Sequence, residues 1–253
     1  MKQIVTRAGE ISLDYRTRLA GIKITQKETA KDLVTEADVA VENYLVEQIK
    51  KRYPDHSILG EESGTHSGND YRWIIDPIDG TLSFIHNQPF YSISVAVEHC
   101  GQTLLAAVNA PVLGEFFTAE LGKGATLNDN PIRVSNCDTL ADAMLATGFA
   151  CMRGNQTRNN MPYFNTLMPK IRDIRRYGSA AIDLCYLACG KIDGLWELYL
   201  QIYDIAAGML IAQEAGATVT DFSGKNTKKL PSEIMATNGK LHKELSEILL
   251  KIQ

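Results

Sequence analysis

The chain has 253 residues, of which 45% are hydrophobic and 22% are charged, and its formal net charge is −4. A chain of this length and composition can bury a substantial core, either as one large domain or as two smaller ones. The acidic balance gives no electrostatic basis for binding nucleic acid or an anionic membrane, so neither partner is expected.

The N-terminal region predicts two helices. Apolar residues recur at helical spacing from about Ile4 to Leu19, and a polar, mobile loop is expected over residues 25–32. The second helix opens at Thr35, because Asp38 three residues later completes the pattern of a capping box. Pro54 marks the end of this helix.

The next region predicts strands. A short strand is expected at Ser57–Leu59, a loop at residues 65–71, and a buried strand at Trp73–Ile75. Three further strand-like runs are separated by Gly, Asn or Pro, which indicates antiparallel hairpins. These runs are Tyr91–Glu98, Thr103–Asn109 and Glu115–Ala119.

The last third predicts two helices and a strand. Helices are expected at Ala180–Ala188 and Asp204–Ala215, the second with Gly216 as its C-terminal cap, and a strand at Ala217–Thr220. A change in composition near residues 133–140 divides the chain into halves without a linker that would make them independent.

Cysteines, histidines and apolar runs narrow the functional classes. Cys185 and Cys189 stand in an apolar helical pattern and are interpreted as small buried residues, not as a disulfide or zinc pair. The scattered histidines give little support to a zinc hydrolase. Since neither a leader peptide nor an apolar run long enough to span a bilayer is found, we expect a cytoplasmic protein.

The most informative motif begins where the apolar run Trp73–Ile75 stops. Asp76 and Asp79 flank a proline turn, and Gly80 and Thr81 follow at an expected helix start. Paired carboxylates at the end of a strand suit a divalent cation, and backbone N–H groups at a helix start suit a phosphate oxygen. The motif therefore indicates metal-dependent chemistry on a phosphate.

Two more carboxylates stand at element ends, Glu61 after the strand near Leu59 and Asp204 at a helix start. Each has a structural interpretation, because Asp204 and Asp79 can cap helices and Glu61 can be a solvated loop acid. If the four acids meet in space, their mutual repulsion requires a hard dication such as Mg²⁺ or Mn²⁺. Asp38 has the same ambiguity, since it can serve the capping box alone or accept a hydrogen bond from another hydroxyl.

Together these segments resemble the inositol monophosphatase family of the lithium-sensitive, metal-dependent phosphatase superfamily. The resemblance rests on five segments in the family's order, which span most of the chain. They are residues 32–38, residues 60–63, residues 76–81, residues 178–181, and Trp196-Glu197 with residues 203–208. Tyr203 stands where many relatives have Trp, a change that keeps an aromatic ring.

The resemblance implies an α+β fold, a layered α-β-α-β-α sandwich, and usually a homodimer. Residues 1–253 would form one compact unit, with the metal motifs in a half up to about residue 135. The substrate wall and the last metal ligand would lie in the half from about residue 136.

The resemblance also implies a set of site residues. Two to three Mg²⁺ ions, or Mn²⁺, would be held by Glu61, Asp76, Asp79, Asp204 and the carbonyl of Ile78. Thr81 and Asp38 would activate a metal-bound water, and Asp79 would hold the water that protonates the leaving group. The substrate would contact Gly80, Thr81, Ser179, Ala180, Glu197 and Lys27.

The implied reaction is direct attack of a metal-activated water on a small phosphate monoester, most naturally inositol 1-phosphate. Histidinol phosphate, fructose 1,6-bisphosphate, adenosine 3′,5′-bisphosphate and NADP remain alternative substrates within the family. A haloacid-dehalogenase-like phosphatase is disfavoured, because its D-x-D-G-T motif is one residue shorter than the segment from Asp76 to Thr81. A regulatory protein that binds the transcription machinery is the alternative from another class.

Overall fold

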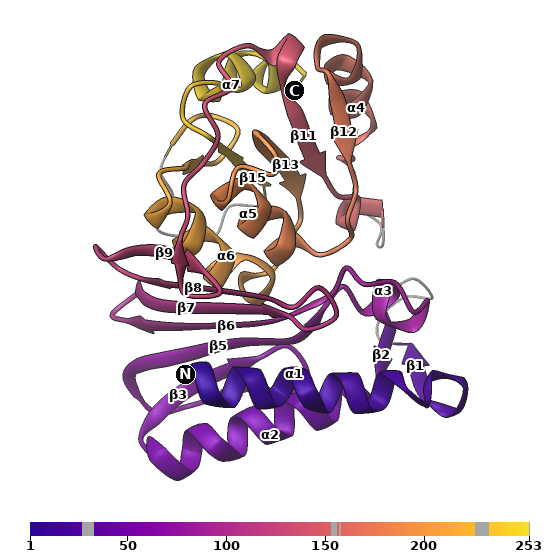
Figure 1. The fold of residues 1–253 in the computed structure, drawn as a ribbon, viewed down its shortest axis with the longest axis vertical. Helices are drawn as coiled ribbons and strands as arrows, with labels where there is room; N and C mark the ends of the chain where they lie inside the picture. The colour runs from indigo at the N-terminus through magenta and orange to yellow at the C-terminus, as the bar shows by residue number, and fades with distance from the viewer. Residues whose placement is uncertain (27–32, 153–155, 157, 226–232, 253) are drawn as a thin grey trace.

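The structure, a computed structural model, describes residues 1–26, 33–152, 156, 158–225 and 233–252. Figure 1 shows a helix pair, a large sheet, a second helix pair, a smaller sheet and outer helices stacked in that order. This arrangement confirms the layered α-β-α-β-α sandwich.

The helices agree well with the sequence pattern. Thr35 caps α2, and its capping box with Asp38 is formed, as predicted. All nine residues of α5 are buried, which is typical of a helix packed between two layers. The helices are α1 (Lys2–Arg16), α2 (Glu36–Arg52), α3 (Thr81–Ile85), α4 (Met161–Leu167), α5 (Ala180–Ala188), α6 (Ile202–Glu214) and α7 (His242–Leu250). Short 3₁₀ turns lie at Leu19–Gly21, Leu140–Asp142, Ala150–Met152 and Met168–Lys170.

The large sheet has eight strands in the order β10-β9-β8-β7-β6-β5-β3-β4. Strands β5 to β9 pair antiparallel in chain order, which confirms the predicted hairpins, whereas β3 runs parallel to β5. The strands are β3 (His56–Gly60), β4 (Gly64–His66), β5 (Asn69–Asp79), β6 (Ser92–His99), β7 (Gln102–Ala110), β8 (Glu115–Glu120), β9 (Gly124–Leu127) and β10 (Asn130–Pro131).

Two loop predictions are corrected by the structure. Residues 65–71 include most of β4 and the start of β5, because pairing with neighbouring strands satisfies a backbone that carries exposed polar side chains. Thr25 and Gln26 lie in β1 (Ile24–Gln26), which pairs with β2 (Leu33–Thr35). Residues 27–32 of that predicted loop are outside the described residues.

The smaller sheet is built from the last third of the chain, in the order β12-β11-β13-β15-β14. Its strands are β11 (Met144–Thr147), β12 (Asp173–Arg175), β13 (Gly194–Leu198), β14 (Thr218–Thr220) and β15 (Glu233–Thr237). The predicted strand at 217–220 is thus present as β14.

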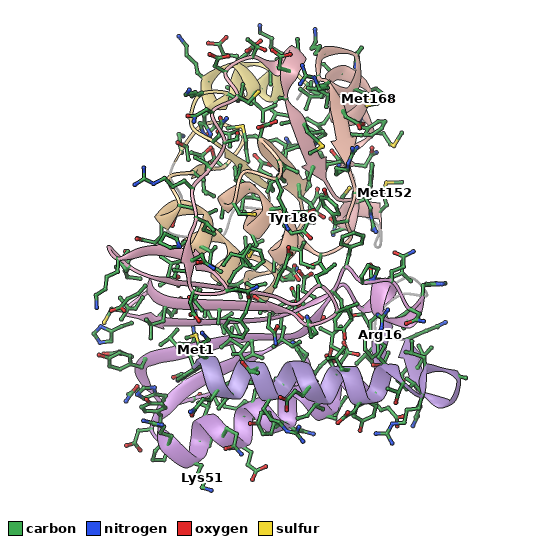
Figure 2. All side chains as sticks on the ribbon, in the orientation of Figure 1. Met1, Arg16, Lys51, Met152, Met168 and Tyr186 are labelled. Atoms are coloured by element: carbon green, nitrogen blue, oxygen red, sulfur yellow. The ribbon has the colours of Figure 1, made fainter. Side chains whose placement is uncertain are left out.

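The main core fills the middle layer. Apolar residues of α5 and α6 pack between the two sheets, and Tyr186 lies within this layer, whereas Met152 and Met168 lie at the outer side near β12 (Figure 2). A second core lies between the large sheet and the pair α1 and α2. Burial of both faces of the large sheet makes its strand β5 a rigid support for the residues at its end. Within the described part of the chain, the helices are too short or too polar to cross a bilayer.

Candidate metal and phosphate site

The end of β5 brings two carboxylates into the interior. Asp76 pairs with Ser94 of β6, and Asp79 pairs with Ser92 after a shift in register. Their side chains meet that of Asp204, which comes from α6, and one oxygen from each of the three carboxyl groups lies within 4.8 Å of the others. The predicted convergence of Asp76, Asp79 and Asp204 is therefore present.

Of the three clustered acids, Asp76 receives the least support for a negative charge from neighbouring hydrogen bonds. Its side chain is 1% exposed, and Oδ1 is buried without a hydrogen-bond partner among the described residues. Burial, followed by the charges of Glu61 and Asp79, raises the pKa of Asp76 well above its usual value. Glu61, the predicted fourth ligand, therefore lies beside Asp76. An unpaired buried oxygen among negative charges suits a bound cation.

Asp79 is held by the start of α5. Its Oδ2 accepts hydrogen bonds from the Ser179 hydroxyl at 2.5 Å and from Ala181 N–H at 2.7 Å, and Oδ1 accepts from Ala180 N–H at 3.3 Å. Burial raises the pKa of Asp79 to about 6, although these hydrogen bonds act in the opposite direction. The carboxylate is therefore fixed in place while remaining within reach of the other acids.

Asp204 enters the cluster through the packing of α6 on the large sheet. The Ser94 hydroxyl donates to the Tyr203 carbonyl at 3.4 Å, which ties the first turn of α6 to β6. Gln201 is the N-cap, and Asp204 accepts its N–H at 2.5 Å from the third helical position, so the suggestion that Asp204 is itself the cap is wrong. Burial and then the charge of Asp79 raise the pKa of Asp204 well above its usual value.

A hydroxyl and a buried carboxylate lie next to the acidic cluster. Thr81 Oγ1 donates to Asp38 Oδ1 at 3.3 Å and to the Ile78 carbonyl at 3.2 Å. The other oxygen of Asp38 accepts the N–H and hydroxyl of Thr35, so the capping box orients Asp38 toward Thr81. The two interpretations of Asp38 are thus compatible.

Gly80 gives α3 its sharp start beside the acids. Its φ of 100° lies in the left-handed region, and a Cβ there would lie 2.9 Å from the Phe90 carbonyl and 3.1 Å from the Gly178 carbonyl. Only glycine fits both the conformation and the space. The suggestion that Asp79 caps this helix is wrong, since Gly80 is the N-cap and no side chain caps it.

The predicted substrate wall lies partly within the same region. Ser179 is engaged by Asp79, and Ala180 begins α5 next to it. The charge of Glu197, a buried residue of β13, contributes to the raised pKa of Asp204, so Glu197 lies within electrostatic reach of the cluster. Lys27 lies outside the described residues.

The sequence interpretation missed Asp183, a buried acid of α5. Asp183 is 3% exposed, and burial followed by the charge of Glu197 raises its pKa well above its usual value. An aspartate inside the apolar run of α5 was the available signal.

Glu42 was also missed, although it supports the loop that carries Glu61. Glu42 lies on α2 and is 2% exposed, and its carboxylate accepts the N–H groups of Glu62 at 2.9 Å and Ser63 at 2.6 Å. A Cβ at Gly60 would lie 2.5 Å from the Glu42 carboxylate, so a larger residue there would displace the carboxylate from its present position. A lone Glu on the apolar face of a predicted helix was the available signal.

Replacing Glu42 by Gln is expected to weaken the binding of a divalent cation at the acidic cluster. The amide lacks one acceptor oxygen, so one loop N–H loses its partner and Glu61 becomes less well placed. Loss of such a supporting contact typically costs roughly 10- to 100-fold in metal affinity. The half-saturating Mg²⁺ concentration in a thermal-shift titration measures the effect, and the exposed Glu47→Gln on the same helix is the control. An unchanged half-saturating Mg²⁺ concentration in Glu42→Gln would contradict this role.

The acidic cluster, the glycine-led start of α3 and the five-layer fold are features of a phosphatase that acts with divalent cations. The carboxylate donors could hold such an ion. The family model of the inositol monophosphatase family matches residues 1–253, and the chain belongs to this family.

Individual relatives agree with this assignment. The chain is 43% identical to Nus factor SuhB of Pseudomonas aeruginosa over 245 residues, which cover 94% of this chain and 90% of the relative. It is 43% identical to inositol-1-monophosphatase of Synechocystis sp., over 90% of this chain and 80% of the relative. The crystal structure of extragenic suppressor protein suhB from Bartonella henselae has a TM-score of 0.93 and 36% identity, with 99% and 97% of the two chains covered.

Proposed function

We propose that the chain is a Mg²⁺-dependent phosphatase that hydrolyses small phosphate monoesters, with inositol 1-phosphate as its preferred substrate. The observation that carries the proposal is the buried oxygen of Asp76, within the cluster of Asp79 and Asp204, for which the described residues offer no hydrogen-bond partner. The family and the relative named inositol-1-monophosphatase support the substrate class. Two to three Mg²⁺ ions, replaceable by Mn²⁺, and the homodimer implied by the resemblance belong to the same proposal.

In the proposed reaction, one set of residues binds the cations and another binds the phosphate. Glu61, Asp76, Asp79 and Asp204 bind the cations, which neutralise phosphate charge and acidify water when bound. The N–H groups of Gly80 and Thr81 bind a phosphate oxygen at the start of α3. Positioning and charge stabilisation supply most of the catalysis in such a reaction.

The proton path begins at Thr81. Its hydroxyl lies 3.3 Å from Asp38 Oδ1, so the pair takes up a proton of the attacking water. The water oxygen forms a bond to phosphorus while the bond from phosphorus to the ester oxygen breaks. The leaving alkoxide takes a proton from a second water held by Asp79, and the proton on the Thr81–Asp38 pair returns to the resulting hydroxide, which gives an alcohol and inorganic phosphate.

Replacing Thr81 by Ala is expected to lower turnover by about 100-fold, because a positioned proton acceptor typically contributes that much or more. The Mg²⁺ concentration for half-maximal activity should change little, since the hydroxyl is not proposed as a metal ligand. Steady-state kinetics across an Mg²⁺ titration separates the two effects. Thr81→Ser should recover most of the turnover, and normal turnover in Thr81→Ala would remove the proposed role.

A substrate panel tests the preference for inositol 1-phosphate. The comparison includes fructose 1,6-bisphosphate, histidinol phosphate, adenosine 3′,5′-bisphosphate, NADP and p-nitrophenyl phosphate, all with Mg²⁺. Glu197→Gln should lower kcat/KM for inositol 1-phosphate by roughly 10- to 100-fold, the effect of weakening a hydrogen bond to a charged group. It should leave p-nitrophenyl phosphate, which lacks sugar-like hydroxyls, nearly unchanged. A panel led by another substrate would overturn the preference while leaving the phosphatase class intact.

A second candidate function is a binding role in transcription. It is favoured by the name Nus factor SuhB of the Pseudomonas aeruginosa relative. Asp79→Asn should abolish hydrolysis, so this variant separates the two roles in a strain that lacks the native chain. Full rescue of the deletion phenotype by Asp79→Asn would favour binding, and failure of a well-expressed variant to rescue would favour catalysis.

A further inference from the structure

Three side chains of a different kind meet at the far end of the large sheet. We propose that Asp70, His99 and Cys100 form a second, exposed site for a divalent transition metal ion of intermediate softness, such as Zn²⁺ or Co²⁺. One carboxylate oxygen, one imidazole nitrogen and the thiol sulfur all lie within 4.8 Å of one another. His99 Nε2 and Cys100 Sγ are 3.7 Å apart.

The backbone ties the three residues together. Asp70 lies at the start of β5, His99 ends β6, and Cys100 lies in the tight turn that leads into β7. The Cys100 N–H donates to the Asp70 carbonyl at 3.2 Å, and His99 faces Tyr71 in the pairing of β5 with β6. The ligands therefore come from three positions whose spacing is set by the sheet.

A stack of rings orients the imidazole. The His99 ring stacks on Tyr71 with centroids 4.3 Å apart, and Tyr71 stacks on His56 at 4.9 Å. His56 in turn stacks on Tyr53 at 4.7 Å, and its Nδ1 lies 3.1 Å from Trp73 Nε1. Because this stack holds the plane of the His99 ring, Nε2 faces the Cys100 sulfur before any ion arrives. Such support from neighbouring groups raises metal affinity.

The donor set and spacing fit a tetrahedral ion. Bonds of about 2.0 Å to nitrogen or oxygen and about 2.3 Å to sulfur place tetrahedral ligands about 3.3–3.6 Å apart. The separation of His99 Nε2 from Cys100 Sγ is already close to this value, and the exposed side chains of Asp70 and Cys100 are free to adjust to the rest. The fourth position faces solvent and would take water.

The site is distinct from the acidic cluster in both place and chemistry. Asp70 and Asp76 lie six residues apart on β5, which corresponds to about 20 Å along a strand. The acidic cluster offers oxygen alone, whereas this site offers sulfur, nitrogen and oxygen, which select softer ions. Binding converts the Cys100 thiol to a thiolate and releases its proton to solvent. No local sequence pattern indicates the site, since Asp70 lies on a different strand from His99.

The test is a titration of the full chain with Co²⁺ in the presence of saturating Mg²⁺, which competes for the acidic cluster. The expected result is one equivalent of Co²⁺ with a thiolate-to-cobalt charge-transfer band in the near ultraviolet, displaced by Zn²⁺. Cys100→Ser and Cys100→Gly should lose the band, the second without backbone strain, because Cys100 has a φ of 50°. His99→Gln and Asp70→Asn should weaken binding by at least about tenfold.

Cys137→Ser is the matched control, since Cys137 is another free and partly accessible thiol. It should retain the band, and all variants should keep the phosphatase activity measured with Mg²⁺. A band that survives in Cys100→Ser, or the absence of any band in the native chain, would overturn the site. Neither result bears on the proposed hydrolysis.

Discussion

Asp76→Asn is expected to lose roughly 1,000-fold or more in turnover while the protein stays folded. The amide keeps the shape of the side chain but removes a charge that no other described group replaces at the buried Oδ1 position. Loss of one preorganised charge at such a centre typically costs about 100- to 1,000-fold, and a metal ligand belongs at the upper end. Turnover at saturating Mg²⁺ measures the loss, and the melting temperature in a chelator measures folding.

The same substitution should not destabilise the metal-free protein, which is obtained by adding a chelator. Asp76 is surrounded by Glu61, Asp79 and Asp204, whose charges oppose its ionisation. Removing the charge of Asp76 relieves its repulsion with these three acids, so the melting temperature in a chelator should be unchanged or higher. Asp70→Asn is the control at the other end of β5 and should retain activity. Native turnover in Asp76→Asn at saturating Mg²⁺ would show that the metal assignment is wrong.

The second large expected effect is a pH dependence of the stability of the metal-free protein. The folded-state pKa of Asp79 is raised to about 6, and those of Asp76 and Asp204 are raised well above the ordinary value of 3.8. Between the unfolded and folded pKa values, the folded protein holds more protons than the unfolded chain. The stability contributed by these acids is complete below about pH 4 and is lost as the pH rises through about 6 and beyond.

The metal-free protein should therefore lose the stability contributed by the three buried acids between pH 5 and pH 7.5. Added Mg²⁺ should restore stability. At a free Mg²⁺ concentration of about 100 Kd, binding adds about 3 kcal/mol, or about 5–10 °C in melting temperature for a chain of this size. Denaturant unfolding in a chelator at the two pH values measures the contribution as the difference between the native chain and Asp76→Asn. The exposed Asp142→Asn should behave as the native chain. An equal pH dependence in the native chain and Asp76→Asn would contradict the assignment.

Local patterns predicted much of the secondary structure correctly. The capping box of Thr35 and Asp38 needs only residues three apart, so the start of α2 could be found without any tertiary contact. The predicted helix at 180–188 has the bounds of α5. The loop prediction for residues 65–71 was wrong, because the backbone there is paired despite its polar side chains, with the adjacent strand β3 in a tight hairpin and, from Tyr71, with β6.

The sequence also indicates the residues of the acidic cluster, since the turn after Trp73–Ile75 is a local motif and the resemblance implies its partners. The proximity of their side chains in space, however, does not follow from any local motif. Asp204 lies near Asp76 only because α6 packs on the large sheet, where the Ser94 hydroxyl donates a hydrogen bond to the first turn of the helix.

The sequence by itself determined the motifs that carry the resemblance to the family, because each motif lies within a short segment, and that resemblance in turn implied the layered fold and the identity of the clustered acids. Only the tertiary structure decided that Asp76 Oδ1 has no hydrogen-bond partner among the described residues, that Glu42 supports the Glu61 loop, and that Asp70 meets His99 and Cys100. Burial and the distance between residues far apart in the chain depend on how layers pack, and no local pattern contains that information.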